Sequence, residues 1–256
     1  RQVYPIFLDV ISSQKISVGP PFYHKLIAPF LIPFLFAMAI GPRLKWIRSD
    51  LKDKIYLISL LIISILISFF IVKNFSTNIL INTILISSAL YLFFITLRDF
   101  FSKKYKNFAQ NTAHFGFSLL ILSILFNNLF SSEIITNLKV GETYDNSKTK
   151  IVFESILQKK EKNYKSIIAN FNITDLKGKN NNLSPELRIY NQPNITTSEA
   201  DIKTTLMKDK FIVINLVQNQ DYFNVRYQVK PFMLWIWLSV IMISLGGLVS
   251  FLQKRI

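Results

Sequence analysis

One stretch sets the fold class: Asn111-Thr112-Ala113-His114-Phe115-Gly116-Phe117-Ser118, which opens an apolar run that continues to Phe130. The run is broken mainly by small and hydroxyl residues, which is typical of a membrane helix. His114 lies inside it, and the chain has only two histidines. An ionisable side chain at membrane depth is costly unless it faces a partner, a cofactor or water.

His114 has two interpretations from the residue alone. Neutral imidazole is a common axial ligand of haem iron, so His114 is a candidate ligand of a haem held between helices. It is equally compatible with a helix–helix hydrogen bond, or with a histidine near enough to the interface to stay hydrated. Thr112 and Ser118 are nearby polar groups that could satisfy the second ring nitrogen.

Composition favours a membrane protein over a nucleic-acid-binding domain. Half of the 256 residues are hydrophobic and the formal net charge is +15. The apolar residues come in blocks of about 20, long enough to cross a bilayer core of about 30 Å as a helix. We therefore predict no nucleic-acid partner. The chain has no cysteine, which excludes disulfides, thiolate metal sites, c-type haem attachment to this chain and cysteine catalysis.

We predict five membrane spans. The first contains Pro29 and Pro33 and follows Gly19-Pro20-Pro21, which we interpret as a stop before the membrane, so its start is expected to be irregular. The first four spans form a membrane block at 22–130, and the last belongs to a segment at 231–256 that ends in a short tail. The spans are Phe22–Ile40, Ile55–Val72, Asn78–Leu97, Phe108–Phe130 and Pro231–Leu252.

Loop charge predicts the orientation. The loops 43–54 and 98–107 are basic, and the tail carries Lys254 and Arg255. Short basic loops stay on the cytoplasmic or matrix side of a membrane. We therefore expect segments 1–21 and 131–230 on the opposite, periplasm-like side. This arrangement suits a bacterial inner membrane, or a mitochondrial inner membrane.

Segment 131–230 is predicted to be an external domain, because its pattern differs from that of the membrane spans. Runs at 151–157, 166–174, 211–217 and 222–229 have the length and the β-branched content of strands, and 175–180 is a turn by its Gly and Asn content. The charged run 159–162 is interpreted as a solvated hairpin tip. We predict an antiparallel β-sandwich or barrel of about six to eight strands. It contains neither histidine nor cysteine, so we assign no catalytic residue.

The predicted fold is a polytopic α-helical membrane protein with a β domain inserted before its last span. A set of short stretches also lies in a fixed order and spacing over nearly the whole chain: Tyr4-Pro5, 16–22, Gly41-Pro42, 113–116, 138–142, 188–191, 197–202, 229–237 and 245–247. Together with the β domain before the last span, these stretches resemble CcmF, the membrane haem lyase subunit of cytochrome c maturation.

The resemblance implies a function. Proteins of this family work with a haem chaperone and deliver haem to apocytochrome c outside the cytoplasmic membrane. They also carry a b-type haem among their helices, thought to supply electrons to the haem being attached. One axial ligand is the histidine of an Ala-His-x-Gly-type position, which is His114 here. The resemblance thus implies haem b as cofactor and His114 as an axial ligand of its iron.

Other parts of the family pattern are missing from this chain. The family's tryptophan-rich haem-handling region, its two external histidines and the second b-haem histidine belong to an earlier part of the protein. His24 matches no family ligand and is expected at the external interface. We expect this chain to be the carboxy-terminal part of a haem lyase, working with a missing amino-terminal part or other subunits, and not active alone.

A rival function is a non-catalytic membrane permease or assembly subunit whose β domain docks a partner. The Trp235-Ile236-Trp237 cluster fits an aromatic belt at the membrane surface, or a platform beside a haem-delivery surface. Arg188, Tyr190 and Glu199 lie in family-like stretches, but the resemblance implies no chemical role for them.

Overall fold

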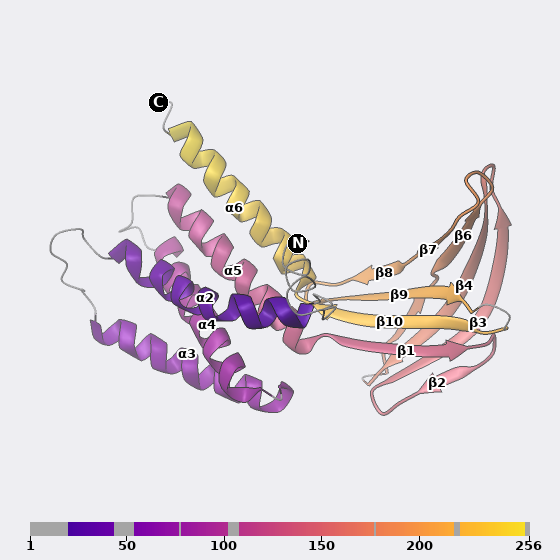
Figure 1. Cartoon of the computed structure of the whole chain (residues 1–256), viewed down its shortest axis with the longest axis horizontal. Coiled ribbons are helices and arrows are strands. Elements are labelled where there is room, and N and C mark those ends of the chain that lie inside the picture. Colours follow the sequence, from indigo (N-terminus) through magenta and orange to yellow (C-terminus); the bar gives the residue numbers. More distant parts are fainter. Residues whose placement is uncertain are drawn as a thin grey trace, which may run out of the picture. The chain divides into compact units, whose positions relative to one another are not determined.

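The computed structural model describes residues 20–43, 54–76, 78–101, 108–176, 178–217 and 221–253, with side chains described from Ile27 onward. The predicted amino-terminal segment 1–21, most of loop 43–54, loop 102–107 and the tail 254–256 fall largely or wholly outside these ranges. The chain divides into two units, Arg1–Leu122 with Ser239–Ile256, and Ser123–Leu238. Each is described by itself (Figure 1).

The first unit is built from apolar helices, as predicted. They are α2 (Pro20–Ile40) with the short turn η1 (Gly41–Arg43), α3 (Lys54–Phe75), α4 (Ile79–Phe101), α5 (Phe108–Phe130) and α6 (Met233–Gln253), the last two reaching into the second unit. By length and composition α3, α4, α5 and α6 can each cross a membrane, and α2 contributes the apolar stretch Ile27–Arg43. The multi-pass membrane fold is confirmed.

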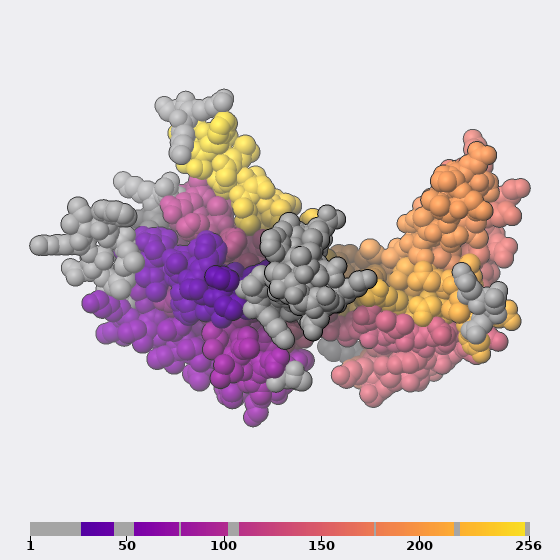
Figure 2. Space-filling view, viewed as in Figure 1, coloured from indigo at the N-terminus to yellow at the C-terminus, as the bar shows by residue number. Residues whose placement is uncertain are grey.

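Burial separates the helices of this unit into central and peripheral ones. Half of the apolar window of α4 is buried, against 22% for α3 and 11% for α6. On α3 large apolar side chains such as Ile55, Ile58 and Phe70 stay exposed, and on α6 so does Leu248. Both helices can be followed by colour on the surface in Figure 2. A helix that exposes apolar side chains over most of its length is suited to lipid.

The start of the first helix differs from the prediction. We expected Gly19-Pro20-Pro21 to stop the chain before the membrane, but α2 begins at Pro20 and runs through Pro29 and Pro33. Proline fits the first turn of a helix because the amide it lacks would have no partner there. The predicted stop is therefore a helix start.

The second unit holds the predicted antiparallel sandwich. One sheet has the order β1-β10-β9-β8 and the other β2-β3-β4-β6-β7, with β5 also pairing with β4. The strands are β1 (Ser132–Leu138), β2 (Thr143–Asp145), β3 (Thr149–Lys160), β4 (Tyr164–Asp175), β5 (Asn180–Leu183), β6 (Glu186–Tyr190), β7 (Thr196–Glu199), β8 (Asp201–Thr204), β9 (Lys208–Leu216) and β10 (Phe223–Pro231).

The sandwich is confirmed, but the described residues form ten strands where we expected six to eight. The four long predicted strands are β3, β4, β9 and β10. The run 159–162 joins β3 to β4 as a hairpin, as expected. Four of the additional strands, β2, β5, β7 and β8, have only three or four residues each. Segments of that length carry no hydrophobic alternation that a sequence could reveal.

Alternating side chains from both sheets make the core. Phe153 of β3 stacks on Phe171 of β4 at 4.4 Å between ring centroids, and Ile212 and Val225 face them from the other sheet. An ion pair joins the two sheets beside this core. Lys210 Nζ of β9 donates to the Asp175 carboxylate of β4, and the Lys210 side chain is 5% exposed. A buried lysine requires such a partner, because an isolated charge there would be strongly unfavourable.

Candidate functional site around His114

The side of α5 that faces α4 is fixed by two contacts. The Phe115 ring stacks on Phe100, with 5.2 Å between centroids. The Ser118 hydroxyl lies 2.7 Å from the Thr96 hydroxyl in a buried position. Both contacts lie within about one helical turn of His114, so they set the rotation of α5 at this residue.

His114 is directed between α4 and α2. Phe117, on its other side, meets Phe34 of α2 edge-on at 6.0 Å. Successive helical residues are about 100° apart, so His114 lies between Phe117, which faces α2, and Ser118, which faces α4. Helix α2 also packs directly against α4. His114, which is partly exposed, therefore lies on the face of α5 between the sides that contact α2 and α4.

The side of α5 next to His114 touches α6 almost backbone to backbone. A Cβ atom placed on Gly246 would lie 2.7 Å from the Ala113 nitrogen and 2.8 Å from the Ala113 Cβ. One placed on Gly116 would lie 3.0 Å from the Ile243 nitrogen. Small residues permit this close approach of membrane helices. The backbone on both sides of His114 is thus held against α6.

A charged pair closes the same end of the bundle. Arg43 Nη2 donates to both carboxylate oxygens of Asp99, at 2.7 and 3.0 Å, and the side chains are only 10% and 14% exposed. Asn111 Nδ2 donates to the Asp99 backbone carbonyl at 3.0 Å. Asn111 lies about one helical turn before His114, so this bond brings the end of α4 close to that part of α5. Asp99 therefore belongs to the surroundings of His114.

The sequence alone did not single out this pair. From the sequence, Arg43 is only one of the basic loop residues that predict the membrane orientation. Asp99 is the one acidic residue in the sequence of the five apolar helices, and a carboxylate in a membrane helix needs a partner. The sequence therefore predicts that Asp99 is paired, but it does not identify Arg43 as the partner.

The two hydroxyls considered for orienting His114 have other partners. Thr112 Oγ1 donates to the Phe108 carbonyl at 2.7 Å, and Ser118 Oγ can donate to the Phe115 carbonyl at 2.8 Å in addition to its contact with Thr96.

The surroundings of His114 fit one axial ligand of a haem. Within the described ranges no group of three or more His, Cys, Asp or Glu side chains could hold a bare metal ion. A haem needs no such cluster, because the porphyrin supplies four nitrogen ligands and the protein only axial ones. An imidazole at a helix junction rich in phenylalanine meets that requirement. The side chain of His24, the other histidine, lies outside the described residues.

The other residues singled out from the sequence lie in the second unit. Trp235 Nε1 donates to the Leu206 carbonyl at 3.0 Å, while Trp237 is 63% exposed. The three family-like residues do come together: Arg188 lies beside Tyr190 and 4.0 Å from Glu199. Hydrogen bonds that the Arg188 guanidinium donates to the Glu186 and Tyr190 side chains raise the pKa of Arg188 above its ordinary value. This cluster ties β6 to β7 on the surface.

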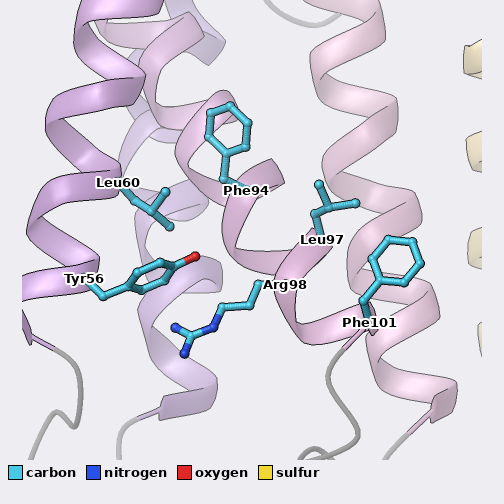
Figure 3. A pocket seen from close by; sticks show the side chains of 6 residues that line it. All are labelled: Tyr56, Leu60, Phe94, Leu97, Arg98 and Phe101. Carbon is cyan, nitrogen blue, oxygen red and sulfur yellow. The ribbon is translucent and has the colours of Figure 1, made fainter.

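A separate hollow lies between α3 and α4, away from His114. Its volume is about 480 Å³, and Figure 3 shows the side chains that line it, Tyr56, Leu60, Phe94, Leu97, Arg98 and Phe101. The Arg98 guanidinium lies 4.1 Å from the centroid of the Tyr56 ring, a cation–π contact. The lining contains no histidine, so the hollow is not the site predicted from the sequence.

Comparison with known proteins agrees with the sequence resemblance. Residues 129–231 match the family model described as the CcmF C-terminal beta-sandwich. The chain is 24% identical over 270 residues to the cytochrome c-type biogenesis protein CcmF of Pseudomonas fluorescens, covering 99% of this chain and 40% of that protein. It is 23% identical over 260 residues to CcmF of Escherichia coli K12, covering 98% of this chain and 40% of that protein.

The fold agrees as well. A solved structure of the cytochrome c heme lyase CcmF superimposes with a TM-score of 0.72 at 18% identity, covering 96% of this chain and 41% of that one. The chain therefore spans about 40% of the length of the curated relatives it matches. Its resemblance to the carboxy-terminal part of CcmF, a protein of cytochrome c biogenesis, is confirmed.

Proposed function

We propose that this chain is the carboxy-terminal part of a membrane cytochrome c haem lyase, and that it holds a b-type haem through His114. The observation that carries the proposal is the position of His114 on α5, between Phe117, which contacts α2, and Ser118, which contacts α4. Similarity along the whole chain to CcmF proteins supports the wider assignment.

Each residue around His114 has a distinct part in this proposal. His114 supplies a neutral imidazole nitrogen to the iron. The ion pair between Arg43 and Asp99 fixes η1 to the end of α4. Phe115 and Phe100 supply an apolar, water-excluding wall. Gly246 and Gly116 keep α5 in place against α6. When bound, the haem would supply one-electron redox chemistry.

Ligation itself needs more than this chain. We infer that a haem chaperone and apocytochrome c meet the complete lyase on the side of the β domain, and that the preceding part of the lyase contributes the remaining haem-handling groups. The described residues of the β domain contain no histidine, and the domain is assigned a docking role, not a chemical one.

We further propose that the β domain lies on the periplasmic side, on the evidence of the lysines and arginines in loops 43–54 and 98–107. Reporter fusions at Asn180 and Asp50 test this. The Asn180 fusion should be active only with a periplasmic reporter and the Asp50 fusion only with a cytoplasmic one. The reverse pattern would refute the orientation.

The haem assignment is tested in the purified complex by Soret absorbance per chain. A His114→Ala chain should lose most of its b-type haem, and maturation of c-type cytochromes should fall with it. His24→Ala is the matched control and should keep both, because His24 is the only other histidine. Full haem in the His114→Ala complex would rule out the assignment. A haem-free wild-type complex would favour a non-catalytic assembly subunit.

A further inference from the structure

We propose that the turn between β8 and β9 is a membrane contact of the β domain, with Leu206 and Met207 inserted at the lipid–water boundary. The inference does not depend on haem binding. It requires only that α6 crosses the membrane, and it assigns the lipid bilayer as the occupant of an apolar surface that the fold leaves open.

The turn exposes large apolar side chains at one end of the sandwich. Leu206 is 60% and Met207 is 55% exposed. Leu176, 72% exposed, follows Asp175, whose carboxylate pairs with Lys210 shortly after the turn. Single exposed apolar residues are ordinary, but two adjacent ones exposed on the same turn can mark a contact surface.

Hydrogen bonds hold this turn at the level where α6 begins. The Phe232 amide donates to the Met207 carbonyl at 2.8 Å, and Trp235 Nε1 donates to the Leu206 carbonyl at 3.0 Å. Both donors lie within the first turn of α6 or just before it. Since α6 starts at Met233 and is long enough to span a bilayer, the turn lies at the height of the membrane surface.

A second membrane helix is fixed to the same level. Asn127 Nδ2, near the end of α5, donates to the Pro231 carbonyl at 2.5 Å. The rings of Phe126 and Phe130 lie 5.5 and 6.5 Å from the Phe232 ring. Phe232 has a left-handed backbone with φ of 62°, which is unfavourable for a residue with a side chain and persists only where its surroundings hold it. These contacts fix the end of α5 to the residues that join β10 to α6.

Charge around the turn suits lipid headgroups. Lys208 directly follows Met207 and is exposed, as is Lys203 on β8. Long cationic side chains beside an interfacial apolar residue reach the phosphates of lipids. Trp237, exposed on the first turns of α6, is the aromatic residue expected at this depth. The turn thus combines exposed apolar side chains with flanking lysines, and it lies near an exposed tryptophan. This combination favours a lipid bilayer over a protein partner.

Site-directed labelling tests the proposal without background, because the chain has no cysteine. Leu206→Cys and Met207→Cys chains would carry an environment-sensitive fluorophore, with the full chain reconstituted in phospholipid nanodiscs. Leu157→Cys is the matched control: Leu157 is 57% exposed on β3, near the hairpin at the opposite end of the strands. A quencher attached to lipid should reduce fluorescence at 206 and 207 several-fold more than at 157, and iodide in solution should do the reverse.

Two results would overturn the membrane contact. Labels at 206 and 207 that respond like the label at 157 would place the turn in water. Labels shielded from both quenchers would mean that protein covers the turn. If Leu206→Cys does not fold, Met207→Cys alone gives the same comparison. A haem spectrum is not a readout here, so failure of the haem assignment leaves this test unaffected.

Discussion

Asp99 shows why one charged residue in a membrane helix must be understood through its partner. Its ion pair joins positions 56 residues apart, in η1 just after α2 and near the end of α4. The sequence marks Asp99 as costly but does not identify Arg43, because a pair so distant depends on how the helices pack. The position of His114 next to this pair is likewise a product of packing, whereas its presence in a membrane helix is evident from sequence.

Breaking this pair should destabilise the helices. Arg43→Gln or Asp99→Asn alone leaves a poorly hydrated charge, which we expect to lower the free energy of unfolding by up to roughly 3 kcal/mol. The double variant should recover much of the loss, because neither charge remains. Thermal unfolding of the four chains in detergent completes the double-mutant cycle. Additive losses would show that the pair does not act as a unit.

Tyr227 predicts how the β domain responds to alkali. Burial, followed by the nearby Asp175 carboxylate, raises the pKa of its hydroxyl well above the ordinary value, so the folded state keeps the neutral phenol. An unfolded tyrosine ionises near pH of about 10. As the pH rises above this value, Tyr227 loses its phenolic proton in the unfolded state before it does so in the folded state. Ionisation therefore favours the unfolded state, and the free energy of unfolding falls as the pH rises.

A Tyr227→Phe domain should therefore lose less stability between neutral and alkaline pH than the wild type. At neutral pH its stability should change little, because the hydroxyl is buried without a hydrogen-bond partner among the described residues. Urea unfolding across this pH range measures both effects. Parallel alkaline losses in the two proteins would contradict the explanation.

At the scale of elements, the sequence predicts what is long and repetitive. The apolar runs predict α3 to α6 to within a few residues, and β-branched runs predict β3, β4, β9 and β10. The ends of the helices are harder to predict. Helix α2 begins at Pro20, where the sequence predicts a stop. Short strands such as β5 and β7 exist only because a longer neighbour offers free backbone groups, and no local pattern announces them.

The α5–α6 contact can be tested with two adjacent glycines. Gly246→Ala places a methyl group against Ala113, so it should separate α6 from α5 and lower haem occupancy at His114. Gly247→Ala is the matched control, since nothing lies within 4 Å of its added Cβ. Alanine favours a helix over glycine by roughly 0.5–1 kcal/mol, so the control should be neutral or slightly stabilising. Equal effects of both changes on Soret absorbance would refute the role of the contact.

At the scale of the whole molecule, the two units divide the work. The helical unit carries the candidate haem ligand, and the β domain has a core of its own made of side chains between Leu138 and Tyr227. The order of spans and the insertion of a sandwich before the last helix were predictable from sequence. The arrangement that directs His114 between α2 and α4 was not, because it depends on contacts among three helices.

The β domain should fold without the helices. Expressed as residues 131–231, it should be soluble and show a circular dichroism spectrum dominated by β structure, because its sheets and core are complete within that range. It should bind no haem, since it contains no histidine or cysteine. A mainly helical spectrum would contradict the independence of the domain, and a stoichiometric Soret band would contradict the placement of haem among the helices.

The central claim is that the imidazole of His114 coordinates haem iron, and chemical rescue tests it most directly. In a His114→Gly complex, b-type haem should be depleted. Added imidazole should restore haem content and a low-spin spectrum, because the free ligand can occupy the vacated axial position. A His114→Gly complex that keeps its haem spectrum without imidazole, or one that loses haem and does not respond to imidazole, would contradict axial coordination by this residue.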